Sequence, residues 1–139
     1  MSTHSDIERV RKKLNTNGDK LMRGVVLEAL KRIKNRTPVD TGRARNNWNV
    51  SEGSPDYGTT TATGDTALAR GAAVIANLKF GDTAYITNGL PYIPTLEYGG
   101  YGPGPKTVGG FSRQAPAGMV GITVAELKPW VDAQVRKLN

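Results

Sequence analysis

A proline followed four residues later by a glycine, within residues 37–48, is the feature that most constrains this chain. Pro38 has no N–H and its ring clashes with the preceding turn, so a helix that reaches it must end just before it. Asp40 can hydrogen-bond neighbouring backbone groups, and Gly42 can adopt a positive φ, which lets the chain reverse direction. We expect Trp48 to anchor the next element. Together, these four residues are predicted to form a structural hinge.

The residues before the hinge have the period of one long amphipathic helix. Ser5 or Asp6 is a suitable N-cap, and the helix is predicted to end near Arg36. Residues 15–18 are poor helix formers, so a break there is an alternative, but we expect one helix. Apolar residues recur every three or four positions and are expected to form its core face: Ile7, Val10, Leu14, Leu21, Val25 and Ala29, widened by Met22, Val26, Leu30 and Ile33.

A strand, a loop, a short helix and a second strand are predicted after the hinge. Residues 46–51 alternate polar and apolar side chains, as a half-buried strand does. Residues 51–65 are polar, and we expect a loop that needs contacts from neighbouring molecules to become ordered. Asp65 is a suitable cap for a helix of small residues, and residues 83–87 are predicted to form the second strand.

The C-terminal third is predicted to contain a helical turn, an irregular loop and a last helix. Proline is common at helix starts, so residues 91–96 should form a compact helical turn. Residues 99–110 are rich in Gly and Pro and should be irregular. The last helix is expected to begin at Ala115 or Pro116 and to kink where Pro129 removes a hydrogen bond. These elements predict an α+β fold, with a long N-terminal helix and a C-terminal helix packed on a small, mainly antiparallel sheet.

The chain is basic at one end only. Its net charge is +7; the first 45 residues hold 12 Lys or Arg against 5 acids, and the other 94 residues hold 7 of each. A concentrated positive field favours nucleic acid or an acidic protein surface, and a solvated helix face is the alternative interpretation. The candidates for contact with DNA or an acidic partner are Arg11, Lys12, Lys13, Lys20, Arg43 and Arg45.

Composition narrows the class of protein further. A chain of 139 residues fits a single domain. It contains no cysteine, which excludes disulfides and thiolate chemistry. The N-terminus is too polar for a signal peptide, and no apolar run reaches the length of a membrane-spanning helix. We therefore expect a soluble protein without a membrane partner.

Two stretches have the residue types of a catalytic motif but not its spacing. Residues 99–107 resemble a phosphate-binding loop, but Pro105 supplies no N–H and no apolar strand leads directly into the loop. Residues 55–56 and 126–128 contain the acids and lysine of a magnesium-dependent nuclease, but they lie too far apart for one strand hairpin. His4 is the only histidine, which argues against a catalytic triad or a histidine metal site. We predict no enzyme activity, no cofactor and no metal.

Glu97 lies among aromatic residues beside the Gly-rich loop, and two interpretations of it remain open. Its carboxylate could pair with an arginine of an adjacent subunit, or it could cap a turn or pair with Arg43 or Arg45 of its own chain. The second interpretation is favoured. Exposed aromatic side chains suit a protein interface, so the predicted contact surface comprises Glu97 with Tyr92, Tyr98 and Tyr101.

A series of short motifs resembles a known family. Thr-Pro-Val-Asp-Thr-Gly at residues 37–42 precedes Arg-Ala-Arg and the aromatic Trp48, and further motifs follow at residues 85–88, 90–92, 96–99 and 114–119. In this order and spacing they resemble the neck or tail-completion proteins of long-tailed bacteriophages, including the minor tail protein Z group. The polar loop at residues 51–65 is longer than the family pattern, so no family detail is carried into it.

The resemblance implies a structural virion protein at the phage head–tail junction, present in the host cytoplasm during assembly. Such a protein would form a ring of six copies that joins a head-completion or stopper protein to the tail tube or terminator protein. The ring would leave a channel for genomic DNA, with transient and non-specific contact. One alternative is a free nucleic-acid-binding protein that uses the basic helix, and another is a metal-dependent nuclease.

Overall fold

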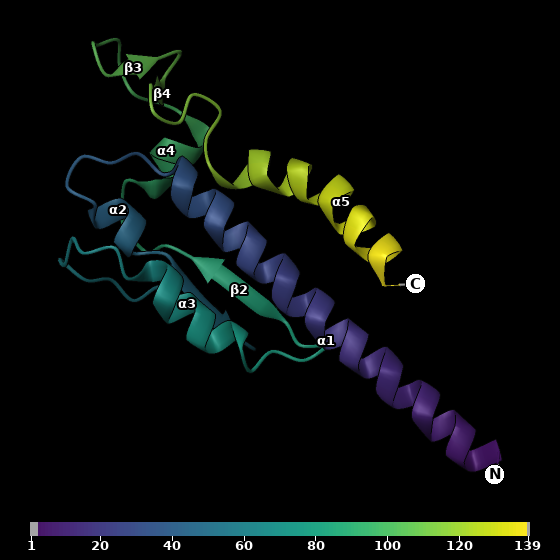
Figure 1. Ribbon diagram of the computed structural model, residues 1–139. Helices are drawn as coiled ribbons and strands as arrows, with labels where there is room; N and C mark the ends of the chain where they lie inside the picture. The colour runs from purple at the N-terminus through teal and green to yellow at the C-terminus, as the bar shows by residue number, and fades with distance from the viewer. Residues whose placement is uncertain (1–2, 139) are drawn as a thin grey trace.

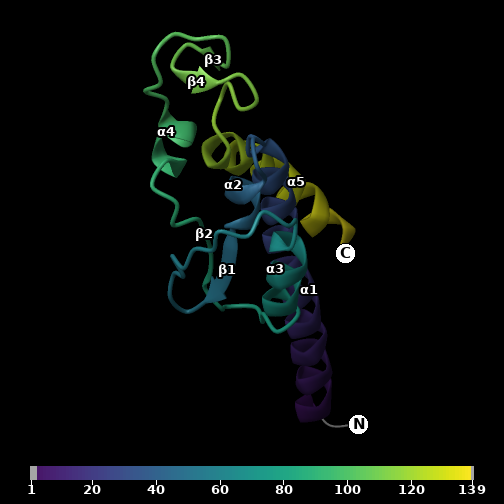
Figure 2. The same ribbon diagram turned by 90° about the vertical axis from the view of Figure 1, so that its left-hand side faces the viewer.

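One long helix runs through the molecule and other elements pack on its two sides. The computed structural model describes residues 3–138. Helix α5 (Val120–Lys137) lies along one side of helix α1 (Thr3–Arg36), and helix α3 (Ala67–Ile75) lies with a strand pair on the other side (Figure 1, Figure 2). The predicted α+β class is confirmed, with a long N-terminal helix, a C-terminal helix and small antiparallel sheets.

The first half of α1 projects beyond the rest of the molecule (Figure 1). The helix is unbroken, as predicted, but the exposed fractions of Ile7, Val10 and Leu14 are 52%, 58% and 65%. Their assignment to the core is wrong, because hydrophobic period identifies a helix face and not whether anything covers it. The buried part of the stripe begins further along the helix, at Val26, Ala29, Leu30 and Ile33.

Thr37 connects the end of α1 to the residues that follow the hinge. Its hydroxyl donates to the Ile33 carbonyl at 2.7 Å and accepts the indole N–H of Trp48 at 2.8 Å. The side chains of Thr37 and Trp48 are both buried, with exposed fractions of 0% and 2%. The helix therefore ends before Pro38, and Trp48 is anchored, as the sequence predicts.

The hinge itself contains a short helix that the sequence analysis did not predict. Gly42 has a φ of +91°, which confirms its predicted role, and helix α2 (Arg43–Asn46) follows it directly. The predicted strand at residues 46–51 is therefore wrong at its start, because its first residue is still helical and Trp48 precedes the strand. Among residues 3–138 the Asp40 carboxylate makes no hydrogen bond, so its predicted backbone contact is absent there.

The main sheet consists of two antiparallel strands, β1 (Asn49–Glu52) and β2 (Ala84–Thr87). Helix α3 closes on β1 and α1 at Gly71, where an added Cβ would lie 2.4 Å from Leu30 and 3.0 Å from Val50. Any larger residue here would force the buried Leu30 side chain to shift, since non-bonded Cβ atoms essentially never lie within 3.0 Å of another heavy atom. This close contact brings the sheet and two helices into one core.

Asp65 does not cap α3. The residue that precedes the helix is Thr66, and it makes no side-chain capping hydrogen bond. Asp65 instead forms an ion pair with Lys34 of α1, with 3.0 Å between the carboxylate and the ammonium group. The sequence shows that Asp65 could cap a helix, but it does not show that Lys34 lies close enough to bind its carboxylate instead.

Three asparagines of the hinge and β1 hold the polar loop in place. Asn47 is the clearest case, because its amide donates to the Thr60 carbonyl at 3.0 Å and accepts the Thr60 N–H at 2.8 Å. Asn46 and Asn49 bind other backbone groups of the loop, at Ala62, Thr66, Asp56 and Gly58. The expectation that residues 51–65 need neighbouring molecules to become ordered is therefore wrong.

The chain between β2 and α5 forms helix α4 (Ile93–Tyr98) and a projecting arm, which we define as residues 99–114 (Figure 2). The predicted helical turn is confirmed, two residues later than expected. Residues 99–110 are not wholly irregular, since a hairpin of strands β3 (Thr107–Val108) and β4 (Phe111–Ser112) begins within them.

Helix α5 begins at Val120 rather than at Ala115 or Pro116. Pro129 lies inside it and cannot donate a hydrogen bond to the carbonyl one turn earlier. The ribbon bends along its length in Figure 1, in agreement with the predicted kink.

A polar cluster fastens α5 to α1. Arg36 donates to the Glu126 carboxylate at 2.6 Å and to the Thr123 hydroxyl at 2.9 Å, and Arg32 donates to the same carboxylate at 3.2 Å. The hydrogen bond from Arg36 holds the pKa of Glu126 below its usual range, and the same contact raises the pKa of Arg36.

We predict that Gly42→Ala destabilises the protein by about 1–3 kcal/mol, the range for a residue forced into an unfavourable backbone conformation. The new Cβ would also lie 2.7 Å from the Thr63 carbonyl oxygen. Gly53→Ala is the matched control, because Gly53 has a φ of +82° but no atom within 4 Å of its Cβ position. Urea unfolding should give a smaller loss for the control; equal losses would show that the contact with Thr63 has no effect.

We also predict that Glu126 makes stability depend on pH in the acid range. Its folded-state pKa is lowered, so its contribution is complete above the pKa of the unfolded chain and is lost as the pH falls through the folded-state value. Glu126→Gln should therefore lower stability near neutral pH and approach the wild type on acidification. Urea unfolding across the acid range measures this difference. Glu52→Gln, at an exposed strand end, is the control; parallel curves for wild type and Glu126→Gln would contradict the prediction.

Candidate subunit-contact surface

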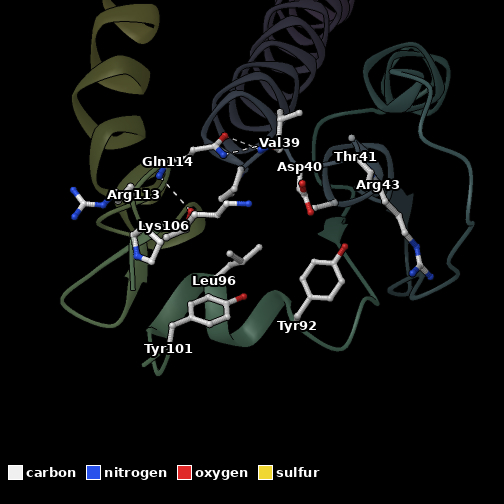
Figure 3. A pocket seen from close by; sticks show the side chains of 15 residues that line it. Val39, Asp40, Thr41, Arg43, Tyr92, Leu96, Tyr101, Lys106, Arg113 and Gln114 are labelled. Atoms are coloured by element: carbon white, nitrogen blue, oxygen red, sulfur yellow. Dashed lines mark hydrogen bonds between the residues drawn. The ribbon is translucent and has the colours of Figure 1, made fainter. Parts of the chain in front are cut away.

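A hollow of about 670 Å³ lies between the hinge, α4 and the arm. Figure 3 shows Tyr92, Leu96 and Tyr101 on one side of it and Val39 and Asp40 on the other. Leu96 is buried, whereas the two tyrosines and Val39 are exposed to between 36% and 42%. The hollow thus offers an apolar and aromatic lining that is open to solvent.

Gln114 fixes the position of the arm relative to the hinge. Its amide accepts the Val39 N–H at 2.8 Å and donates to the Val39 carbonyl at 3.0 Å (Figure 3). An amide side chain is one of the few that can both accept from the N–H and donate to the carbonyl of one residue. The two walls of the hollow are therefore joined by a specific contact.

The charge around the hollow is mainly positive. Arg43, Lys106 and Arg113 line it together with a single carboxylate, that of Asp40. Within residues 3–138, neither Lys106 nor Arg113 takes part in an ion pair. A partner segment that combines acidic and apolar side chains would suit this lining.

The aromatic residues predicted to form a contact surface lie at this end of the molecule. Tyr98 is 81% exposed, and Tyr92 and Tyr101 line the hollow. Exposed tyrosines are characteristic of interfaces, because each supplies a large apolar area and a hydroxyl at little cost in conformational entropy.

Glu97 is not available to another subunit. Its carboxylate accepts three backbone N–H groups at the start of α5, from Met119 at 2.8 Å, Val120 at 2.7 Å and Gly121 at 2.9 Å. The favoured interpretation, that it caps a turn of its own chain, is thus confirmed for a helix terminus. Its assignment as a subunit contact, and its pairing with Arg43 or Arg45, are wrong, because the unpaired N–H groups of a helix start bind a carboxylate well.

Arg43 and Arg45 also serve their own chain. Arg45 donates to the carbonyls of Asn35 at 3.0 Å and Thr37 at 2.7 Å, which completes the hydrogen bonding at the end of α1. Arg43 donates to the Thr60 carbonyl of the polar loop at 3.3 Å. Both side chains are thus held by their own chain, and their predicted contact with DNA or an acidic partner stays a prediction; Arg43 lies at the edge of the hollow.

The remaining basic candidates lie on the exposed part of α1. Arg11 forms an ion pair with Glu8 at 3.3 Å. Lys12, Lys13 and Lys20 are exposed, and none of them has an ion-pair partner in the described part of the chain. Three further basic residues of α1 pair with carboxylates of other elements, which weakens the positive field around them: Arg32, Lys34 and Arg36. Arg23 donates to the Leu78 carbonyl and keeps its charge.

The roles of Gln114 and of the asparagines Asn46, Asn47 and Asn49 were not predicted from the sequence. Three asparagines within residues 46–49, beside a long polar segment, were the available signal, because an amide can pair with both kinds of backbone group in a loop. Across residues 3–138, no group of three or more His, Cys, Asp or Glu residues is placed to hold a metal ion. The same residues contain no helix long and apolar enough to cross a membrane.

Searches of protein-family models, curated proteins and solved structures found no match to this chain.

We predict that Glu97→Gln destabilises the protein by about 1.5–3 kcal/mol, the range for hydrogen bonds that involve a charged group. The amide lacks the negative charge and one of the two acceptor oxygens that bind Met119, Val120 and Gly121. Thermal unfolding of this variant and of the exposed control Glu52→Gln measures the effect. A loss no greater than that of the control would show that the cap contributes nothing.

Proposed function

We propose that the chain is a structural subunit of a phage head–tail junction, which assembles into a ring between head-completion and tail proteins. The single observation that supports this best is the exposed aromatic surface around the hollow, with Tyr98 81% exposed. The motif series at residues 37–48 and 85–119 supplies the assignment to phage necks. Assembly, and not catalysis, is the activity that this surface suits.

A ring needs two unlike surfaces on each copy, because each subunit contacts the next in a head-to-tail manner. The hollow with its tyrosines is one candidate. The polar loop is the other, since the asparagines hold its backbone in place and its residues 52–66 are all exposed. A ring that is stable by itself should bury about 1,000 Å² or more at each contact, and one that forms only on the growing particle should bury less.

Copy number in finished particles tests the proposal. Electron microscopy and quantitative mass spectrometry of purified virions should place six copies at the head–tail junction. Tyr98→Ser should reduce incorporation, because it removes an exposed anchor, while Val135→Ser on the outer side of α5 should not; Val135 is 43% exposed. A single copy per particle, or absence from purified virions, would end this proposal.

The alternative is a free nucleic-acid-binding protein, which the exposed Lys12, Lys13 and Lys20 favour. Three phosphate contacts would give non-specific binding whose logarithm falls with the logarithm of salt concentration with a slope of about −3. Fluorescence anisotropy with unrelated duplexes over a salt series measures this slope. Tight binding to one preferred sequence at physiological salt would favour a regulator over a ring subunit.

A further inference from the structure

The projecting half of α1 carries an apolar stripe that no other element within residues 3–138 covers. Ile7, Val10 and Leu14 are each more than half exposed, and their spacing of three and four residues places them on one face of the helix. Charged residues flank Ile7 and Val10 on both sides in the sequence, and Lys13 and Asn15 flank Leu14. The stripe is therefore narrow, with the width of a helix–helix seam rather than of a broad core face.

This stripe continues the face of α1 on which α5 packs. Leu14 precedes Leu21 by two helical turns, and Leu21 and Gly24 lie beside Trp130 and Leu138 of α5. This side of α1 therefore already packs against one helix, α5. Helix α5 ends near the point where the exposed stripe begins (Figure 1). A second helix would extend the same packing.

The charges beside the stripe identify a second copy of this segment as a suitable partner. Asp6 and Lys13 are seven residues apart, two helical turns, and so lie on the same flank of the helix, with Val10 midway between them. Asp6 is paired with Arg9 of its own chain, whereas Lys13 has no ion-pair partner in the described part of the chain. If two copies lie antiparallel and meet at Val10, Lys13 of each comes close to this Asp6–Arg9 pair of the other and can share its carboxylate. The same arrangement sets Ile7 opposite Leu14, so the apolar and charged contacts agree in register.

The other flank does not oppose this arrangement strongly. Arg11 comes near its own counterpart at the centre of the pair, but it is already in an ion pair with Glu8 of its own chain. An antiparallel pair also places the two bodies, each part of a chain with a net charge of +7, at opposite ends of the paired helices. A parallel pair would bring these like-charged bodies side by side.

We infer that the first four turns of α1 dock on the same segment of a second copy, antiparallel, through Ile7, Val10 and Leu14. This contact is isologous, because the same patch is used on both copies, and it is distinct from the head-to-tail contact of a ring. It does not rest on the proposed function. Three apolar side chains from each copy bury less than the roughly 1,200 Å² of a stable interface, so the pair forms at high protein concentration.

Disulfide trapping tests the contact directly, because the chain has no native cysteine. Val10→Cys should form an interchain disulfide on mild oxidation of the full-length protein, since the two Cβ atoms must come within about 4.5 Å of each other. Lys12→Cys, exposed on the opposite face of the same helix, is the matched control and should cross-link several-fold less. Equal cross-linking of the two variants, or none of either, overturns the inference.

A second pair of variants tests the direction of the helices. A mixture of Ile7→Cys and Leu14→Cys should give the mixed dimer as its main product, because these positions face each other only in an antiparallel pair. Ile7→Cys that cross-links to itself more readily than to Leu14→Cys indicates a parallel pair and overturns the inference as stated.

Association in the absence of cysteine completes the test. Sedimentation of the wild type over a wide concentration range should show a monomer–dimer equilibrium that Val10→Glu abolishes and Lys12→Glu does not. Both variants should keep the fold, because Val10 and Lys12 lie outside the core. Circular dichroism spectra that match the wild type would verify this. A wild type that stays monomeric throughout, or a dimer that survives Val10→Glu, overturns the inference. A ring that assembles normally with Val10→Glu leaves the proposed function intact, so the two proposals fail separately.

Discussion

The fold depends on the buried hydroxyl of Thr37, which is used in both of its hydrogen-bonding roles. As a donor it binds the Ile33 carbonyl in the last turn of α1, and as an acceptor it binds the Trp48 indole. One side chain therefore ends the long helix and fixes the largest residue of the next segment at the same point. A buried donor or acceptor without a partner costs about 1–3 kcal/mol. Loss of the Thr37 hydroxyl would therefore leave the buried Trp48 indole N–H without its partner at about that cost.

This junction determines where the surface features lie. Trp48 follows α2, so its position also sets the positions of Asn46 and Asn47, whose amides hold the polar loop. On the other side of the hinge, Val39 pairs with Gln114 and so places the arm over α4. The hollow and the loop are thus consequences of how the chain leaves α1, and each is held by side-chain amides that bind backbone groups.

The sequence predicts the parts of the fold that local chemistry decides. Pro38 and Gly42 act on their own backbone, and the helix end and the positive φ were predictable from them. The roles of Asp65 and Glu97 were not, because each carboxylate had several possible partners and only the fold brings Lys34 to one and the start of α5 to the other. A residue type indicates which bonds a side chain can make, and tertiary distance selects among them.

The two features that were hardest to predict are the ordered polar loop and the exposed apolar stripe. The polar loop is expected from composition to be mobile, yet amides within the same chain satisfy its backbone. The stripe of Ile7, Val10 and Leu14 is expected from its period to be buried, yet it is exposed. A polar backbone needs only a few well-placed donors and acceptors, which one chain can supply to itself. An apolar face needs area, and the projecting half of α1 is beyond the reach of its own core, so a second molecule is the remaining source of that area.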